Sequence, residues 1–270
     1  MVKKMNKTLF KSTLRENWIV LLAITLIIFM YGSISVSMYD PESIEALVSM
    51  MEFMPEGMIK AMGFDNLGGN LTEYLGGYLY GFIFILFPLI FTVIVANKMI
   101  AKHVDVGSMA YLLTTPISRV RIATTQAMFL VTGITLILVF NVGAIVLFAE
   151  AMIPGSLDIP GFLGINLVTY LVLIAVAGIG FFASCYFNDT RNSFAIGGGV
   201  PILFFVIKLI SEISDNLDWL RFFTIYSFVD VNTVLGNSSY VAMSSIILVA
   251  ISVGLYVGGI TIFNKKSLAI

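Results

Sequence analysis

The chain has 270 residues, of which 59% are hydrophobic and 11% are charged, whereas soluble domains average about 45–50% apolar and about 25% charged residues. This composition indicates a membrane protein and excludes a separate soluble nucleotide-binding domain. The 15 Lys and Arg nearly balance the 16 Asp and Glu, so the chain has no overall basic field to hold nucleic acid. One cysteine, Cys185, and one histidine, His103, exclude an internal disulfide and a histidine-based metal site.

Long runs without charge predict the membrane-spanning segments, because a charge at mid-bilayer costs roughly 2.5–3.5 kcal/mol on insertion scales. Continuous apolar runs are typical of helices, whereas strands of a membrane barrel alternate. We therefore expect one all-α polytopic domain over residues 1–270 with six transmembrane helices. They cover residues 17–39, 74–97, 122–149, 161–187, 193–211 and 241–263.

The distribution of positive charge predicts the orientation. Every Lys and Arg except Lys60, Lys208 and Arg221 falls on the side of the N-terminus when the spans are followed in order. The positive-inside rule therefore predicts that both termini are cytoplasmic. Asp and Glu gather in the outer segments instead, which predicts a negative outer potential that favours cationic solutes.

The segment before the first span is basic on one side. Lys3, Lys4, Lys7, Lys11 and Arg15 fall on one face of a helix, which predicts an amphipathic interfacial helix over residues 3–16. The alternative is a basic flank with no structure of its own. The predicted helix would rest on the anionic lipid of the inner leaflet.

The connection between spans two and three, residues 98–119, is too polar to span and too apolar for an ordinary loop. Met109, Leu112, Leu113 and Pro116 stand at helical spacing, which predicts a short helix over residues 106–115 with these four on one side. Thr115 is then expected to cap the third span. Such a helix suits the groove of a soluble partner, and the alternative is a helix that rests on the inner leaflet.

The run from Gly107 to Arg119, GSMAYLLTTPISR, resembles the G-[ST]-hydrophobic-x-x-L-L-[ST]-x-P-[VI]-[ST]-R signature of permease subunits of type-2 ATP-binding-cassette (ABC) exporters. In that family this segment is the coupling helix that docks on the ATPase. Position 110, often acidic in the family, is Ala110 here. The resemblance assigns ATPase coupling to Gly107, Met109, Tyr111, Leu112, Leu113, Pro116 and Arg119.

The resemblance also implies partners. ABC ATPase subunits on separate chains would bind ATP and Mg, so no cofactor is expected on this chain and it is not expected to be an enzyme. No Gly-x-x-x-x-Gly-Lys-[Ser/Thr] loop is present, which agrees with this division. A second permease copy or a sibling permease would complete the pathway in the lipid bilayer, and the family points to a bacterial plasma membrane.

Polar residues at membrane depth are few and therefore candidates for function. Asn141, Glu150 and Asn166 are candidates for the substrate pathway, with hydrogen bonding between helices as the structural alternative for the two asparagines. Lys208 is expected to pair with Glu212 one turn further on, or to extend outward to the interface.

Two segments of the second half are expected to depart from a plain helix. Gly197, Gly198, Gly199 and Pro201 lie together in span five and are candidates for a flexible hinge, although a static kink is the preferred interpretation. The stretch LRFFTIYSFVDVNTVL before the last span is broken by Asp230 and predicts a re-entrant or interfacial helix on the outer side.

Four functions are compatible with a membrane protein of this size. The leading hypothesis is the permease subunit of an ABC exporter, exporting amphipathic drugs or antimicrobial peptides. An ion-coupled secondary transporter would need a relay of acids or histidines across the bilayer, and a membrane enzyme would need a catalytic constellation; the sequence has neither pattern. A non-transporting anchor or sensor remains an alternative.

Overall fold

The computed structural model describes residues 5–39, 53–54, 70–114, 116–213 and 215–267. All regular secondary structure in these ranges is helical, as expected. Lys3, Lys4, Lys60 and Thr115, on which some of the predictions rest, lie outside the described residues.

Six helical segments of the described chain are long and apolar enough to cross a membrane, which confirms the predicted number. They are α1 (Lys7–Met38), the second span from α4 to α6 (Leu71–Asp105), α8 (Arg119–Met152), α9 (Ile159–Tyr186), the fifth span of α10 and α11 (Thr190–Ile213), and α13 (Ser238–Lys265).

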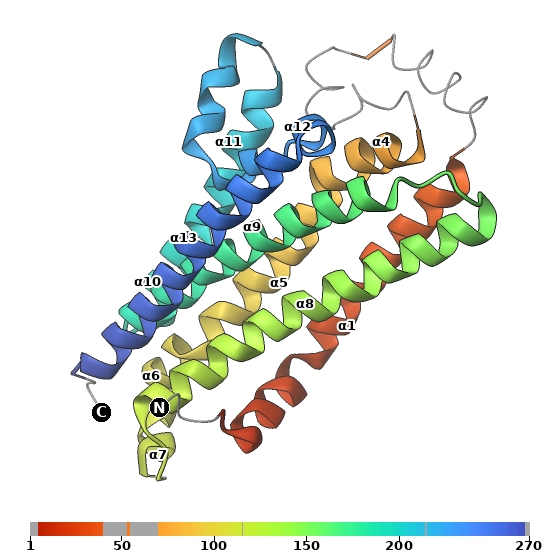
Figure 1. Cartoon of the computed structure of the whole chain (residues 1–270). Coiled ribbons are helices and arrows are strands. Elements are labelled where there is room, and N and C mark those ends of the chain that lie inside the picture. The colour runs from red at the N-terminus through yellow and green to blue at the C-terminus, as the bar shows by residue number, and fades with distance from the viewer. Residues whose placement is uncertain (1–4, 40–52, 55–69, 115, 214, 268–270) are drawn as a thin grey trace.

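The helices form an elongated bundle in which α5 and α9 are central and α1 and α13 are peripheral (Figure 1). The most apolar stretches of the second and fourth spans are 67% buried, against 28% in α1 and 22% in α13. The first described residues and the end of α13 lie at the same end of the bundle, beside α6 and α7. The wide exposed faces of the outer helices are apolar, as lipid contact requires.

The prediction of a separate N-terminal helix over residues 3–16 is wrong for residues 7–16, which the structure describes. Residues 7–16 are instead the first turns of α1, which runs 32 residues without a break. No Gly or Pro interrupts this stretch, and the side chain of Asn6 caps it by accepting a hydrogen bond from the Leu9 amide (3.0 Å). Thr13 Oγ1 donates to Gln126 Oε1 of α8 (3.2 Å), so these turns pack against the bundle.

The second span is less regular than a single helix over residues 74–97. It consists of α4 (Leu71–Leu75), a π-helical segment η2 (Gly76–Ile83), α5 (Phe84–Met99) with Pro88 inside it, and α6 (Ala101–Asp105). A π-helix of two turns is uncommon, and such segments are frequent at functional sites.

The fifth span is divided at Gly198 into α10 (Thr190–Gly197) and α11 (Gly199–Ile213). At Gly197 the two neighbouring helices approach closely: a Cβ atom there would lie 3.1 Å from Gly180 Cα and 3.0 Å from Ala183 Cβ of α9. A Cβ at Gly199 would meet nothing within 4 Å. Gly197 therefore serves close packing against α9, which is a different requirement from flexibility.

The segment before the last span returns from the tip of α11 towards the bundle (Figure 1). The sequence predicts one helix in this segment, but the structure has three short ones. They are η3 (Asp215–Phe223), η4 (Ile225–Phe228) and α12 (Val231–Gly236). The polar residues of the run explain the division, because Thr224 caps η4 and Asp230 caps α12 through backbone amides (3.2 and 3.1 Å). Tyr226 between them is fully buried and holds the segment on the bundle.

Candidate functional site

The connection between the second and third spans contains the short helix α7 (Ser108–Thr114), close to the predicted range of 106–115. The turn before α7 requires a glycine, because Gly107 has a φ of 72°. Ser108 closes this turn: its Oγ donates to the His103 carbonyl oxygen (3.3 Å) and lies 3.0 Å from His103 Nδ1. The orientation of α7 relative to α6 is thus fixed locally.

The faces of α7 differ from the predicted arrangement. Met109 is only 1% exposed and belongs to the core of the bundle, so it positions α7 and is not on its free face. Leu112 is half-buried and packs against the same core. Tyr111, by contrast, is 80% exposed. Pro116, after the helix, is exposed as well.

Arg119 begins α8 and has a partner within the chain. The cap of α8 is Ser118, whose Oγ accepts from the Arg121 amide (3.4 Å), so the expected cap at Thr115 is wrong. Arg119 Nη1 donates to the carbonyl oxygen of Lys266 (2.5 Å), just beyond α13. Lys266 Nζ in turn donates to the carbonyls of Cys185 (3.3 Å) and Tyr186 (2.5 Å) at the end of α9. Partial burial lowers the pKa of Lys266.

The start of α6 is attached to α9. The backbone amides of Ile100 and Ala101 both donate to Ser184 Oγ (3.2 and 3.0 Å), and Ser184 is fully buried. These two bonds satisfy donors at the break between α5 and α6, which a helix end would otherwise leave without partners. Both flanks of α7 are therefore fixed to the bundle by hydrogen bonds between helices.

The three predicted pathway residues do not form one site. Asn166 is buried and accepts a hydrogen bond from Tyr80 of η2 (2.6 Å), which confirms bonding between helices. Asn141 is also buried, but its Nδ2 donates to the Ile137 carbonyl of its own helix (2.7 Å). Glu150 is exposed and accepts from the Gly155 amide (3.3 Å), which is a local turn contact.

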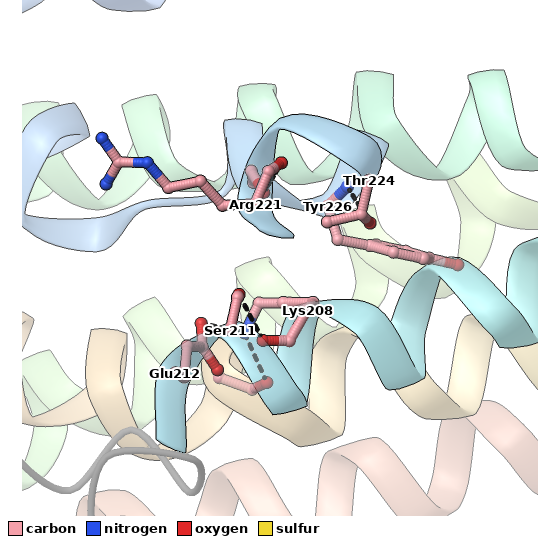
Figure 2. Close-up of polar contacts among 8 residues, drawn as sticks. Lys208, Ser211, Glu212, Arg221, Thr224 and Tyr226 are labelled. Atoms are coloured by element: carbon pink, nitrogen blue, oxygen red, sulfur yellow. Dashed lines mark hydrogen bonds and ion pairs between the residues drawn. The ribbon is translucent and has the colours of Figure 1, made fainter. Parts of the chain in front are cut away.

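A buried cation lies on α11, which extends to the opposite end of the bundle from α7 (Figure 1), and Figure 2 shows it in close-up. Lys208 of α11 is 4% exposed, and its Nζ lies 2.7 Å from Glu212 Oε1 and donates to the Gly81 carbonyl of η2 (3.2 Å). The predicted pairing with Glu212 is confirmed, and Lys208 does not extend outward. The contact with Gly81 was not predicted, because a backbone acceptor in a π-helix has no sequence signature. Figure 2 shows the Arg221 side chain directed away from Lys208.

An apolar groove of about 310 Å³ lies between α8, α9 and α13. Tyr170, Ser252 and Tyr256 are among its lining residues, and the Tyr170 hydroxyl lies 3.0 Å from Thr135 Oγ1. Sequence reasoning did not find this groove, because its residues are ordinary apolar residues of the spans. Among the described residues, no group of three His, Cys, Asp or Glu could hold a metal ion.

The sequence that forms these six spans and the short helix between the second and third matches a known family. Residues 8–268 match the model of the ABC-2 family transporter proteins. The chain belongs to the ABC-2 family. No protein among the curated sequences matches it. As an ABC-2 family member it is the membrane permease subunit of an ABC transporter, a class that generally has no catalytic activity of its own and that associates with ABC ATPases. The family that the segment Gly107–Arg119 resembles is thereby confirmed for the chain as a whole, while ATPase coupling by this segment stays a prediction.

Proposed function

We propose that this permease is the membrane subunit of an ABC exporter and that α7 is its docking element for a separate ATPase chain. The carrying observation is the exposure of Tyr111 on a helix whose other side is buried and whose two flanks are bound to the bundle. A large aromatic side chain in this position provides apolar contact area at low entropic cost, as interface anchors do. Tyr111 is the centre of the docking surface, and the exposed Pro116 lies beyond the end of the helix.

The distribution of positive charge along the chain supports a cytoplasmic location for α7. The end of the bundle that carries α7 also holds Lys98, Lys102, Arg119, Arg191 and Lys266. By the positive-inside rule this end faces the cytoplasm, in a bacterial plasma membrane, with both termini inside. The ATPase partner binds ATP and Mg there, and a second copy of the permease or a sibling permease completes the pathway.

The transported compounds are amphipathic drugs or antimicrobial peptides in this proposal. The groove between α8, α9 and α13 has an apolar wall in which the Tyr170 and Ser252 hydroxyls already form hydrogen bonds with Thr135 and the Leu248 carbonyl, and it suits the apolar part of such a molecule. Closure of the two ATPases on ATP would move α7 and exchange inward for outward access. Cells without the protein should be more sensitive to such compounds; unchanged sensitivity over a broad panel would contradict the substrate class.

Co-purification tests the docking proposal. The tagged permease is extracted from its native membrane in mild detergent, and the proteins that come with it are identified by mass spectrometry. We expect an ABC ATPase to co-purify with the wild type and with Tyr111→Phe. The amount of ATPase recovered with Tyr111→Asp should be at least tenfold lower. Phe222→Asp is the matched control, because Phe222 is 79% exposed at the opposite end of the bundle. Equal recovery of the ATPase with Tyr111→Asp would overturn the assignment of α7.

A further inference from the structure

Asp105, the last residue of α6, joins the connection that carries α7 to the fifth span. Its Oδ2 accepts from the Thr190 backbone amide (3.2 Å) and also from the Thr190 hydroxyl. Thr190 is the first residue of α10. A carboxylate at the start of a helix is also favoured by the helix dipole. The contact therefore fixes the end of α6 to the beginning of α10.

The two ends of α6 are bound to parts of the bundle that differ in burial. At its start, Ser184 binds the chain to α9, which is central. At its end, Asp105 binds α10, and the fifth span is only 33% buried in its most apolar stretch. When α7 is displaced, the deeply packed α9 resists more than the less buried fifth span, so α10 turns about its close contact with α9 at Gly197.

α10 is short and has a distinct end on each side. Asp189 caps its start by accepting from the Asn192 amide (2.7 Å), and Gly198 ends it before α11 begins. Beyond that break, α11 packs along η3 and carries Lys208, which is bound to the Gly81 carbonyl. A rigid helix bounded by a hydrogen-bonded contact and a glycine break has the form of a lever with a pivot.

We propose that Asp105 and Thr190 are positioning residues that transmit movement of α7 to α11, with α10 as the lever and the break at Gly198 as the pivot. The proposal rests on the docking function of α7. It gives Asp105, two residues before Gly107, a binding partner within the permease itself. Movement at the cytoplasmic end thereby reaches the segment that covers the outer end of the bundle.

The distance between the outer ends of α8 and α11 tests this transmission. Nitroxide labels are placed at Ala151→Cys and Ile213→Cys, both exposed, in a Cys185→Ala background. The distance is measured by electron spin resonance in the complex with its co-purified ATPase, without nucleotide and with ATP and vanadate. We expect a nucleotide-dependent shift in the parent protein and in Thr190→Ser, which keeps both donors. Asp105→Ala should lose more than half of that shift, and Glu16→Ala, an exposed acid of α1, should lose none.

The outcomes separate this inference from the docking proposal. A full shift in Asp105→Ala, with the ATPase bound, overturns the lever and leaves docking intact. Loss of the ATPase from Asp105→Ala also overturns it, because Asp105 would then be a docking residue. Absence of any shift in the parent complex overturns it as well. Should Asp105→Ala not fold, Thr190→Val removes the hydroxyl donor alone, and it should reduce the shift without loss of the ATPase.

Discussion

The two ends of the bundle hold their irregular segments in different ways. At the end with α7, hydrogen bonds from side chains to backbone groups of other helices fix the connection: Ser184 to α6, Arg119 to the end of α13, Asp105 to α10. At the opposite end, the buried cation of Lys208 holds α11, and the buried ring of Tyr226 holds the segment from η3 to α12.

The two kinds of contact differ in how easily they break and form again. The Arg119 and Asp105 bonds, unlike the buried Ser184 bonds, lie at a partly exposed surface, where hydrogen bonds are exchanged with water at small cost. A buried charge, by contrast, loses several kcal/mol if its partners are removed. Burial also raises the pKa of Tyr226, which keeps its hydroxyl neutral. We therefore expect the α7 end to be the adjustable end, whereas the contacts of Lys208 stay intact when α11 moves.

The largest effect is expected from the buried cation. Lys208→Met keeps the length of the side chain but removes the cation from Glu212 and the donor from the Gly81 carbonyl. Since the Glu212 side chain is 34% exposed, we expect a loss of about 2–3 kcal/mol, somewhat less than for a fully buried pair. Thermal unfolding in detergent measures this loss of stability. Lys102→Met, at an exposed position, is the control. Equal melting temperatures for the two variants would contradict the importance of the buried contact.

Glycine substitutions in the fifth span come next. A methyl group at Gly197 would displace α10 from Gly180 and Ala183, so Gly197→Ala should cost about 1–3 kcal/mol. Gly199→Ala has open space around it and should change stability by less than about 0.5 kcal/mol. Thermal unfolding of both variants distinguishes packing from flexibility. If both unfold like the wild type but both lose transport, flexibility and not packing is the role of these glycines.

A smaller effect is expected between the second and fourth spans. Tyr80→Phe removes the hydroxyl that donates to Asn166 and leaves the ring in place. Hydrogen bonds between helices in membranes average about 0.6 kcal/mol and reach about 1.7 kcal/mol, and the 2.6 Å contact suggests the upper half of that range. Tyr186→Phe, at an exposed position, is the control for thermal unfolding. A stability equal to that of Tyr186→Phe would show that this bond contributes nothing.

The smallest effect is expected at the adjustable end. Arg119→Ala removes the donor to the Lys266 carbonyl, for a loss of about 0.5–1 kcal/mol confined to the end of α13. Hydrogen exchange of residues 263–267 should become several times faster, with the outer end of the molecule unchanged. Arg221→Ala, which removes an exposed cation at the opposite end, should leave these residues unchanged. Global acceleration in Arg119→Ala would mean that the α7 end is not separately adjustable.

The sequence predicts the spans well and the contacts between them poorly. Span number and position follow from charge-free length, which is a property of each segment alone. Local spacing correctly placed Met109 and Leu112 on one side of α7, but it could not show that this side faces the bundle. That orientation, like the bond from Arg119 to Lys266, depends on where distant helices lie. Lys208 and Glu212 were paired correctly because their partner is one turn away in the same helix.

Photo-crosslinking at position 111 tests the central claim most directly. A benzoylphenylalanine residue replaces Tyr111 in cells that express the permease, and a second strain carries it at Phe222 as control. Irradiation of intact cells should join position 111, and not position 222, to an ABC ATPase identified by mass spectrometry. Adducts of position 111 with lipid alone, or with the same proteins as position 222, would contradict the docking role of α7.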